Sequence, residues 1–145
     1  MPKSTRFTVA CHILASLAFV RDRYVSSEVI AQSVQTNPVV VRRLLALFHG
    51  AGWVHSQVGS RGGTRLAVDP ATISLLDVHD QIEEGSAFAT HQPNPDCPVG
   101  QAIEDSLFAM LDDGEEALRA SLAERTIAEL AQSAREHYGA MRRHA

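Results

Sequence analysis

Four arginines occur in two pairs whose chemistry suits the binding of phosphate groups and base edges. Arg42 and Arg43 are adjacent, whereas Arg61 and Arg65 flank two glycines in the segment SRGGTR. A guanidinium group keeps its positive charge at physiological pH, and its planar N–H donors match phosphate oxygens and the edge of guanine. Taken alone, an arginine pair is typical of a solvated helix face, and a segment such as SRGGTR is typical of a hairpin turn. The two pairs therefore indicate nucleic-acid binding only in a supporting context.

The distribution of charge along the chain supplies that context. Residues 1–66 hold eight lysines and arginines and two acidic residues, which gives a net charge of +6. Residues 67–145 hold five basic and fifteen acidic residues, which gives a net charge of −10. The overall charge of −4 conceals this division. A basic part followed by an acidic part predicts a polyanion-binding module, residues 1–80, joined to a unit of different function, residues 81–145.

The elements expected around the first arginine pair make a helix-turn-helix. Apolar residues three or four positions apart predict a first helix over residues 4–20. A second helix should begin after an N-cap at Ser26, run to about Val34, and bury Val29, Ile30 and Val34.

A third helix should carry the first arginine pair into the major groove of DNA. Asn37 can cap this helix, and Pro38 at its first position loses no useful N–H group. The helix should end near Gly50 or Gly52. In a helix-turn-helix, the start of the second helix of the motif reaches base edges. The residues placed there are Thr36, Asn37, Val39, Val40, Arg42 and Arg43, and Lys3 and Ser27 are further candidate contacts. Instead of contacting DNA, either Val39 or Val40 could pack into the core.

A two-stranded β-hairpin should carry the second arginine pair as a wing. Residues 53–58 and 64–68 have the composition of strands, and residues 59–63 form a glycine-rich turn between them. This turn would let the backbone approach the minor groove, where an arginine reads groove width and potential. The candidate contacts on the wing are Ser60, Arg61, Gly62, Gly63, Thr64 and Arg65.

One long apolar stripe dominates the second part of the chain. A helix is expected over residues 73–82, followed by a polar loop. Over residues 98–122, apolar side chains recur at helical spacing, although Gly114 could break the helix. A stripe of this size should not stay exposed on a monomer, and it predicts a homodimer. The residues of this dimerisation stripe are Val99, Ile103, Leu107, Leu111 and Leu118.

The end of the chain is expected to form only a short helix and a frayed tail. Thr126 with Glu129 has the pattern of a capping box, which predicts a short last helix through Ile127 and Leu130. After about Arg135 the sequence is polar, and a frayed tail is expected.

Two cysteines have different expected environments. Cys11 lies on the apolar face of the first helix and should be a core residue. Cys97 comes just before Pro98, and the positive end of the helix that starts there favours a thiolate, although Asp96 opposes it. Cys97 could therefore react with a small electrophile or oxidant as a sensor, or it could simply pack at the helix start. Two cysteines cannot make a disulfide framework, and no spacing of histidines or cysteines predicts a metal site.

These segments together resemble the Rrf2 family of bacterial winged-helix transcriptional regulators. The resemblance rests on residues 24–31, 37–45, 51–54, 59–63, 97–99 and 126–130. It implies a mainly α-helical fold with a small β-hairpin wing. It also implies a homodimer in which a long helix crosses between the subunits, the third helix reads the major groove and the wing reads the minor groove.

The resemblance also raises the question of an iron–sulfur cluster. Several members of the family hold a cluster through three cysteines in the loop before the long helix. This chain has only Cys97 there, with His91 and Asp96 as weaker substitutes. A cluster needs about four strong ligands, mostly thiolates, so we expect no cluster and no other cofactor. The chain resembles the cluster-free branch of the family.

The expected function is that of a sequence-specific, DNA-binding transcriptional regulator. We expect a cytoplasmic repressor that binds a palindromic operator as a homodimer and is released by modification of Cys97. The alternative is a winged-helix adaptor that binds proteins rather than DNA, although an adaptor has no need of a basic face. A thiol enzyme is disfavoured because no base with a known spacing accompanies Cys97. No apolar run is long enough to cross a membrane.

Overall fold

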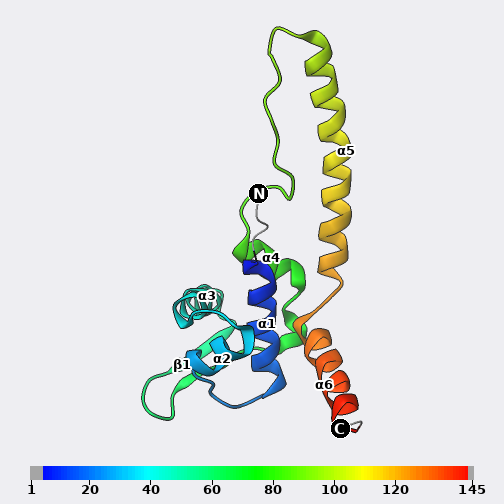
Figure 1. The fold of residues 1–145 in the computed structure, drawn as a ribbon. Coiled ribbons are helices and arrows are strands. Elements are labelled where there is room, and N and C mark those ends of the chain that lie inside the picture. The colour runs from blue at the N-terminus through cyan, green and yellow to red at the C-terminus, as the bar shows by residue number, and fades with distance from the viewer. Residues whose placement is uncertain (1–4, 144–145) are drawn as a thin grey trace.

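The computed structural model describes residues 5–143, which form a mainly helical chain with one two-stranded antiparallel sheet (Figure 1). Lys3, a candidate DNA contact, lies outside these residues. In chain order the elements are α1 (Arg6–Phe19), α2 (Ser27–Val34), α3 (Pro38–Gly50), β1 (Val54–Gln57), β2 (Gly63–Leu66), the 3-10 turn η1 (Pro70–Thr72), α4 (Leu75–Ile82), α5 (Pro98–Ala123) and α6 (Ile127–Arg143). The expected winged helix-turn-helix fold is confirmed.

Local sequence signals set the boundaries of α2 and α3 where they were expected. The hydroxyl of Ser26 accepts a hydrogen bond from the N–H of Val29 at 3.3 Å, which caps α2. Gln35 ends that helix in the left-handed conformation, with φ of 51°. The side chain of Asn37 accepts from the N–H of Val39 at 2.8 Å, and Pro38 follows as the first residue of α3. The turn between the two helices is therefore short and well defined.

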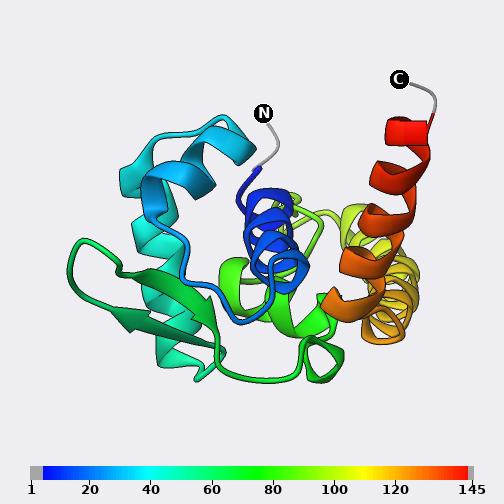
Figure 2. The same cartoon turned by 90° about the horizontal axis from the view of Figure 1, so that it is seen from below.

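The core forms around α1. Buried side chains of this helix, Ile13, Leu14 and Leu17, belong to one cluster with Ile30 of α2 and Phe48 of α3. Two views place α2, α3 and the β-hairpin on one side of α1 and α6 on the other (Figures 1 and 2). Helix α1 thus connects the helix-turn-helix to the last helix of the chain.

One expectation for α2 was wrong. Val29 is 54% exposed, whereas its neighbours Ile30 and Ala31 are buried. Consecutive residues of a helix differ by about 100° around its axis, so a short helix buries only part of its circumference. The pair Ile30 and Ala31 occupies the inner face, and Val34 packs half-buried against the core.

Helix α5 is one continuous element, because Gly114 does not interrupt it. A glycine inside a helix costs about 1 kcal/mol relative to alanine, which the surrounding turns of a 26-residue helix can offset. The helix extends away from the other elements, and the segment that follows α4 runs beside it (Figure 1). None of its residues is buried in the described chain.

The last helix differs from the prediction. The capping box is present: Glu129 accepts from the N–H of Thr126 at 3.1 Å, and the Thr126 hydroxyl accepts from the N–H of Glu129 at 3.1 Å. Helix α6 then continues for 17 residues to Arg143 instead of fraying after Arg135. It packs along α1, and Arg135 itself donates hydrogen bonds to the carbonyls of Ala18 and Phe19 at 2.6 and 3.2 Å. Tertiary contacts therefore order a segment whose sequence is polar.

Candidate DNA-binding surface

The start of α3 presents the side chains expected to reach DNA. Val39 and Val40 are both exposed, so neither packs into the core. The opposite face of the helix buries Val41, Leu44, Leu45 and Phe48, as its apolar spacing predicted. Thr36 is half-buried in the turn before the helix, and Asn37 is exposed while its side chain caps the helix.

Arg42 and Arg43 are exposed but differ in what they contact. The Nε of Arg42 donates to the Ser27 hydroxyl at 3.2 Å, and its terminal nitrogen donates to Glu28 at 3.2 Å. A hydrogen bond at its own backbone N–H and the pair with Arg42 lower the pKa of Glu28. Among residues 5–143, Arg43 has no such side-chain partner. Arg42 is therefore oriented by the start of α2, whereas Arg43 projects from α3 without an internal constraint.

The wing, formed by β1, β2 and residues 58–62 between them, is anchored at its base. Val25 and Thr64 exchange two backbone hydrogen bonds of 2.9 Å, which join the wing to the segment before α2. Thr64 is only 5% exposed, and its hydroxyl lies 3.1 Å from that of Ser56. The side chain of Thr64, a predicted DNA contact, is thus enclosed by the protein, because its strand position faces inward.

The two glycines of the wing are required by its geometry. A Cβ atom on Gly62 would lie 2.1 Å from the carbonyl oxygen of Gln57. Gly63 has φ of 142°, and a Cβ there would lie 2.5 Å from the carbonyl oxygen of Val25. Any side chain at either position would displace backbone, so both glycines shape the turn that presents Ser60 and Arg61.

The wing arginines also differ from each other. Arg61 is exposed in the turn, and so is Val58, which is 98% exposed. Arg65 is half-buried, and its guanidinium carbon lies 4.9 Å from the centre of the Tyr24 ring. The hydroxyl of Tyr24 lies 3.2 Å from Nδ1 of His55, the cross-strand partner of Arg65. Sequence reasoning missed this cluster, because nothing in the spacing of Tyr24 and His55 signals that they meet.

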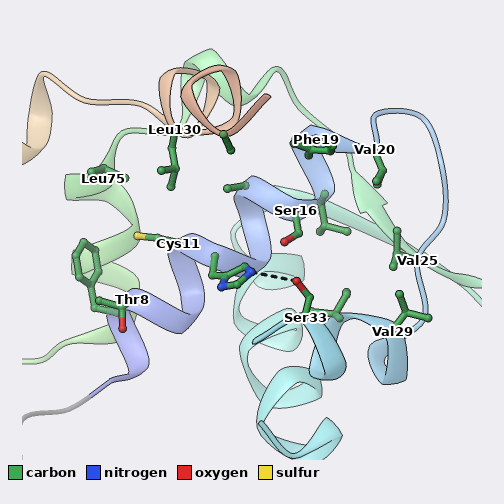
Figure 3. Close-up of a pocket in the computed structure, with 16 residues that line it drawn as sticks. Thr8, Cys11, Ser16, Phe19, Val20, Val25, Val29, Ser33, Leu75 and Leu130 are labelled. Atoms are coloured by element: carbon green, nitrogen blue, oxygen red, sulfur yellow. Dashed lines mark hydrogen bonds between the residues drawn. The ribbon is translucent and has the colours of Figure 1, made fainter. Parts of the chain in front are cut away.

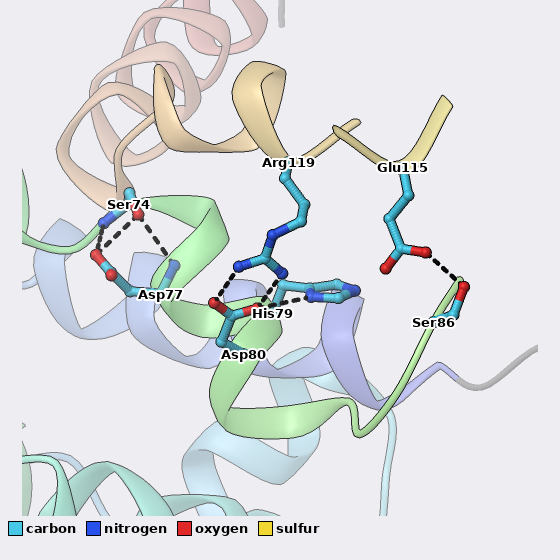
Figure 4. A network of polar contacts seen from close by, with 7 residues as sticks. All are labelled: Ser74, Asp77, His79, Asp80, Ser86, Glu115 and Arg119. Carbon is cyan, nitrogen blue, oxygen red and sulfur yellow. Dashed lines mark hydrogen bonds and ion pairs between the residues drawn. The ribbon is translucent and has the colours of Figure 1, made fainter. Parts of the chain in front are cut away.

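An ion-pair network joins α4 to α5 (Figure 4). The guanidinium of Arg119 in α5 donates two hydrogen bonds, of 2.8 and 2.9 Å, to the carboxylate of Asp80 in α4. This pair, with His79 beside it at 3.3 Å, lowers the pKa of Asp80. About one turn before Arg119 in α5, Glu115 accepts a hydrogen bond from the Ser86 hydroxyl. The network was also missed from sequence, since Asp80 and Arg119 lie far apart in the chain.

Cys97 occupies the N-cap position of α5, at the helix start where the sequence placed it. Its sulfur accepts a hydrogen bond from the N–H of Gly100 at 3.4 Å, and the residue is half-buried. Cys11 is buried in the core, and this burial raises the pKa of its thiol to about 11. Within residues 5–143, no group of three or more His, Cys, Asp or Glu side chains is arranged to hold a metal ion.

The predicted dimerisation stripe is largely exposed on α5. Val99 is 67% exposed and Leu107 is 40% exposed, while Ile103 and Leu118 are also exposed and Leu111 is half-buried. Met110 is also exposed and lines the same shallow surface hollow as Val99, Ile103 and Leu107. Among the described helices, none is long and apolar enough to span a membrane.

Known proteins share both this sequence and this fold. The Rrf2 family, described as "Iron-dependent Transcriptional regulator", matches residues 3–133. YwnA of Bacillus subtilis (strain 168), a protein named as an HTH-type transcriptional regulator, is 40% identical over 126 residues, which cover 86% of this chain and 92% of YwnA. A transcriptional regulator from Lactobacillus plantarum has a crystal structure with a TM-score of 0.76 and 29% identity, covering 97% of this chain and 95% of that one. A crystal structure described as that of a DNA-binding protein has a TM-score of 0.69 and 36% identity, covering 86% of this chain and 97% of that one. The chain therefore belongs to the Rrf2 family: it is an HTH-type transcriptional regulator that binds DNA, and it is not an enzyme.

Proposed function

We propose that this regulator is a sequence-specific repressor that binds a palindromic operator as a homodimer. The observation that carries the proposal is the grouping of exposed basic side chains on the start of α3 and on the wing, both on the same side of α1. A protein that occupies a promoter through two recognition helices excludes RNA polymerase from that site, and repression is the simplest result. The cytoplasm, where the DNA of a bacterium lies, is the corresponding location.

In this proposal each arginine has a distinct task. Arg43 reaches a base edge or a phosphate in the major groove, next to the apolar side chains of Val39 and Val40, which suit thymine methyl groups. Arg42 reaches the DNA backbone while Ser27 and Glu28 hold its orientation. Arg61 enters the minor groove from the wing. Arg65 supports the base of the wing. Thr64 is buried, so its side chain is not a contact in this proposal. The remaining proposed contacts are Lys3, Ser27, Thr36, Asn37, Ser60, Gly62 and Gly63.

The second part of the chain, residues 81–145, would assemble the dimer. An exposed stripe that includes Val99, Ile103 and Leu107 along a helix without buried residues has the character of a subunit interface. Two such helices packed together would place two winged units, residues 1–80, about one turn of DNA apart.

Regulation in this proposal runs through Cys97 rather than through a metal. The family description includes iron, but the donors near the start of α5 do not match an iron–sulfur cluster, because Cys97 is the one thiol there and Cys11 is buried in the core. Modification of Cys97 by an electrophile or oxidant would add bulk at the junction of the loop and α5. That change would alter the spacing of the two winged units and weaken binding.

The test is selection of an operator from random DNA, followed by titration with variants. We expect Arg43→Ala and Arg61→Ala each to weaken binding by about 1–3 kcal/mol. Affinity should also fall steeply with salt, because each neutralised phosphate releases counterions. Arg125→Ala is the matched control, since Arg125 is an exposed arginine just before α6, outside α3 and the wing, whose side chain pairs with Glu129. If both test variants bind as tightly as this control, the surface is not the DNA contact.

A further inference from the structure

A groove crosses α1 between α2 and α6 (Figure 3). Leu75 and Leu130 stand on one side of α1, and Val29 and Ser33 stand on the other. The volume of the groove is about 740 Å³. Small-molecule sites in proteins commonly have volumes of about 300–1,000 Å³, so the groove is large enough for a ligand of ordinary size.

The described side chains that line the groove are mainly apolar. Phe7 and Phe19 contribute aromatic rings, and among residues 5–143 no Asp, Glu, Lys or Arg lines the groove. The same apolar surroundings bury Cys11, which also lines the groove. Charged groups lose their hydration in such a place without gaining a partner, so the lining disfavours an ionic ligand.

Four polar side chains, Thr8, His12, Ser16 and Ser33, interrupt this apolar lining, and two of them pair with each other. Nε2 of His12, from α1, lies 3.1 Å from the hydroxyl oxygen of Ser33, from α2. Both residues line the groove, so together they offer a donor and an acceptor to a molecule inside it. A few polar groups in an otherwise apolar pocket are the usual means of orienting a small ligand.

Large apolar side chains remain exposed on both rims. Val29, on α2, and Leu130, on α6, are exposed although they face the groove. A ligand between them would bury both side chains. No residue of α5 lines the groove, so the predicted dimerisation stripe is a separate surface of the chain.

We propose that this groove binds an uncharged, mainly apolar small molecule that carries one hydroxyl or carbonyl group for His12 and Ser33. The ligand would bridge α2 and α6 across α1. Because α2 packs against α3, such a bridge would bias the position of the recognition helix and change the affinity for DNA. The effect on DNA rests on the proposed function, whereas the binding site does not.

The test uses the neutral fluorophore prodan, which combines a naphthalene ring with one carbonyl group, and the purified full chain. We expect saturable binding with a blue-shifted emission. Ala134→Leu fills the groove from α6 and should weaken binding at least about ten-fold, and His12→Leu should weaken it about five-fold through the lost hydrogen bond. The matched control is Ala109→Leu, an exposed alanine of α5 that does not line the groove and should bind prodan as the parent does.

Four outcomes decide between the alternatives. Equal binding of prodan by the parent and Ala134→Leu overturns the proposal. Binding by the Leu107→Asp variant, designed to be a monomer, but not by the parent shows that a second copy covers the groove, and this also overturns it. Prodan binding that shifts operator affinity in the parent but not in Ala134→Leu supports both the site and its coupling. A parent that binds prodan but no operator retains the site and counts only against the proposed function.

Discussion

At the scale of single residues, the two thiols should differ in reactivity because their environments differ. Burial raises the pKa of Cys11 to about 11, so at neutral pH this group stays almost wholly in its unreactive thiol form. Cys97 is half-buried, and its sulfur accepts from the N–H of Gly100 at the positive end of α5. We expect a mild thiol reagent to modify Cys97 first and to weaken operator binding, as intact-mass analysis and a DNA-binding assay would show. A Cys97→Ser variant that loses DNA to the reagent as readily as the parent would contradict the sensor role.

At the scale of elements, the stability of α6 depends on its contacts with α1 rather than on its own sequence. Arg135 donates to two carbonyls at the end of α1 and lies over the ring of Phe19, with 5.5 Å between the guanidinium carbon and the ring centre. Arg135→Ala should lower the free energy of unfolding by about 1–2 kcal/mol, since it leaves carbonyl groups without their donor. Denaturant unfolding measures the change. Arg142→Ala, on the same helix, is the control and should change stability by less than about 0.5 kcal/mol. Equal effects of the two substitutions would show that α6 is not held through Arg135.

At the scale of the whole molecule, the predicted assembly depends on one face of α5. We expect the unmodified protein to have the mass of two chains in light scattering at micromolar concentration. Leu107→Asp places a charge in the centre of the proposed interface and should yield single chains, with operator affinity reduced by at least about ten-fold. Ala109→Asp introduces the same charge at another exposed position of α5, outside the stripe, and should leave the dimer intact. A parent with the mass of one chain would refute the dimer.

The sequence by itself determined the features that depend on near neighbours. The caps at Ser26 and Asn37, the glycine turn of the wing and the apolar spacing of α3 each act within a few residues, and the structure has them where they were predicted. Cys97 at the start of α5 belongs to the same group, because Pro98 marks the helix start. The family followed from the order of these local signals along the chain.

Only the tertiary structure decided the features that join distant segments. The length of α6, the exposure of Val29, the stacking of Arg65 on Tyr24 and the burial of Thr64 all depend on which surface packs against which. The groove between α2 and α6 belongs here as well, since its walls come from four helices. A local pattern records the preference of a segment for helix or strand. It does not predict the tertiary contacts of that segment, because those contacts are made with residues far apart in the chain.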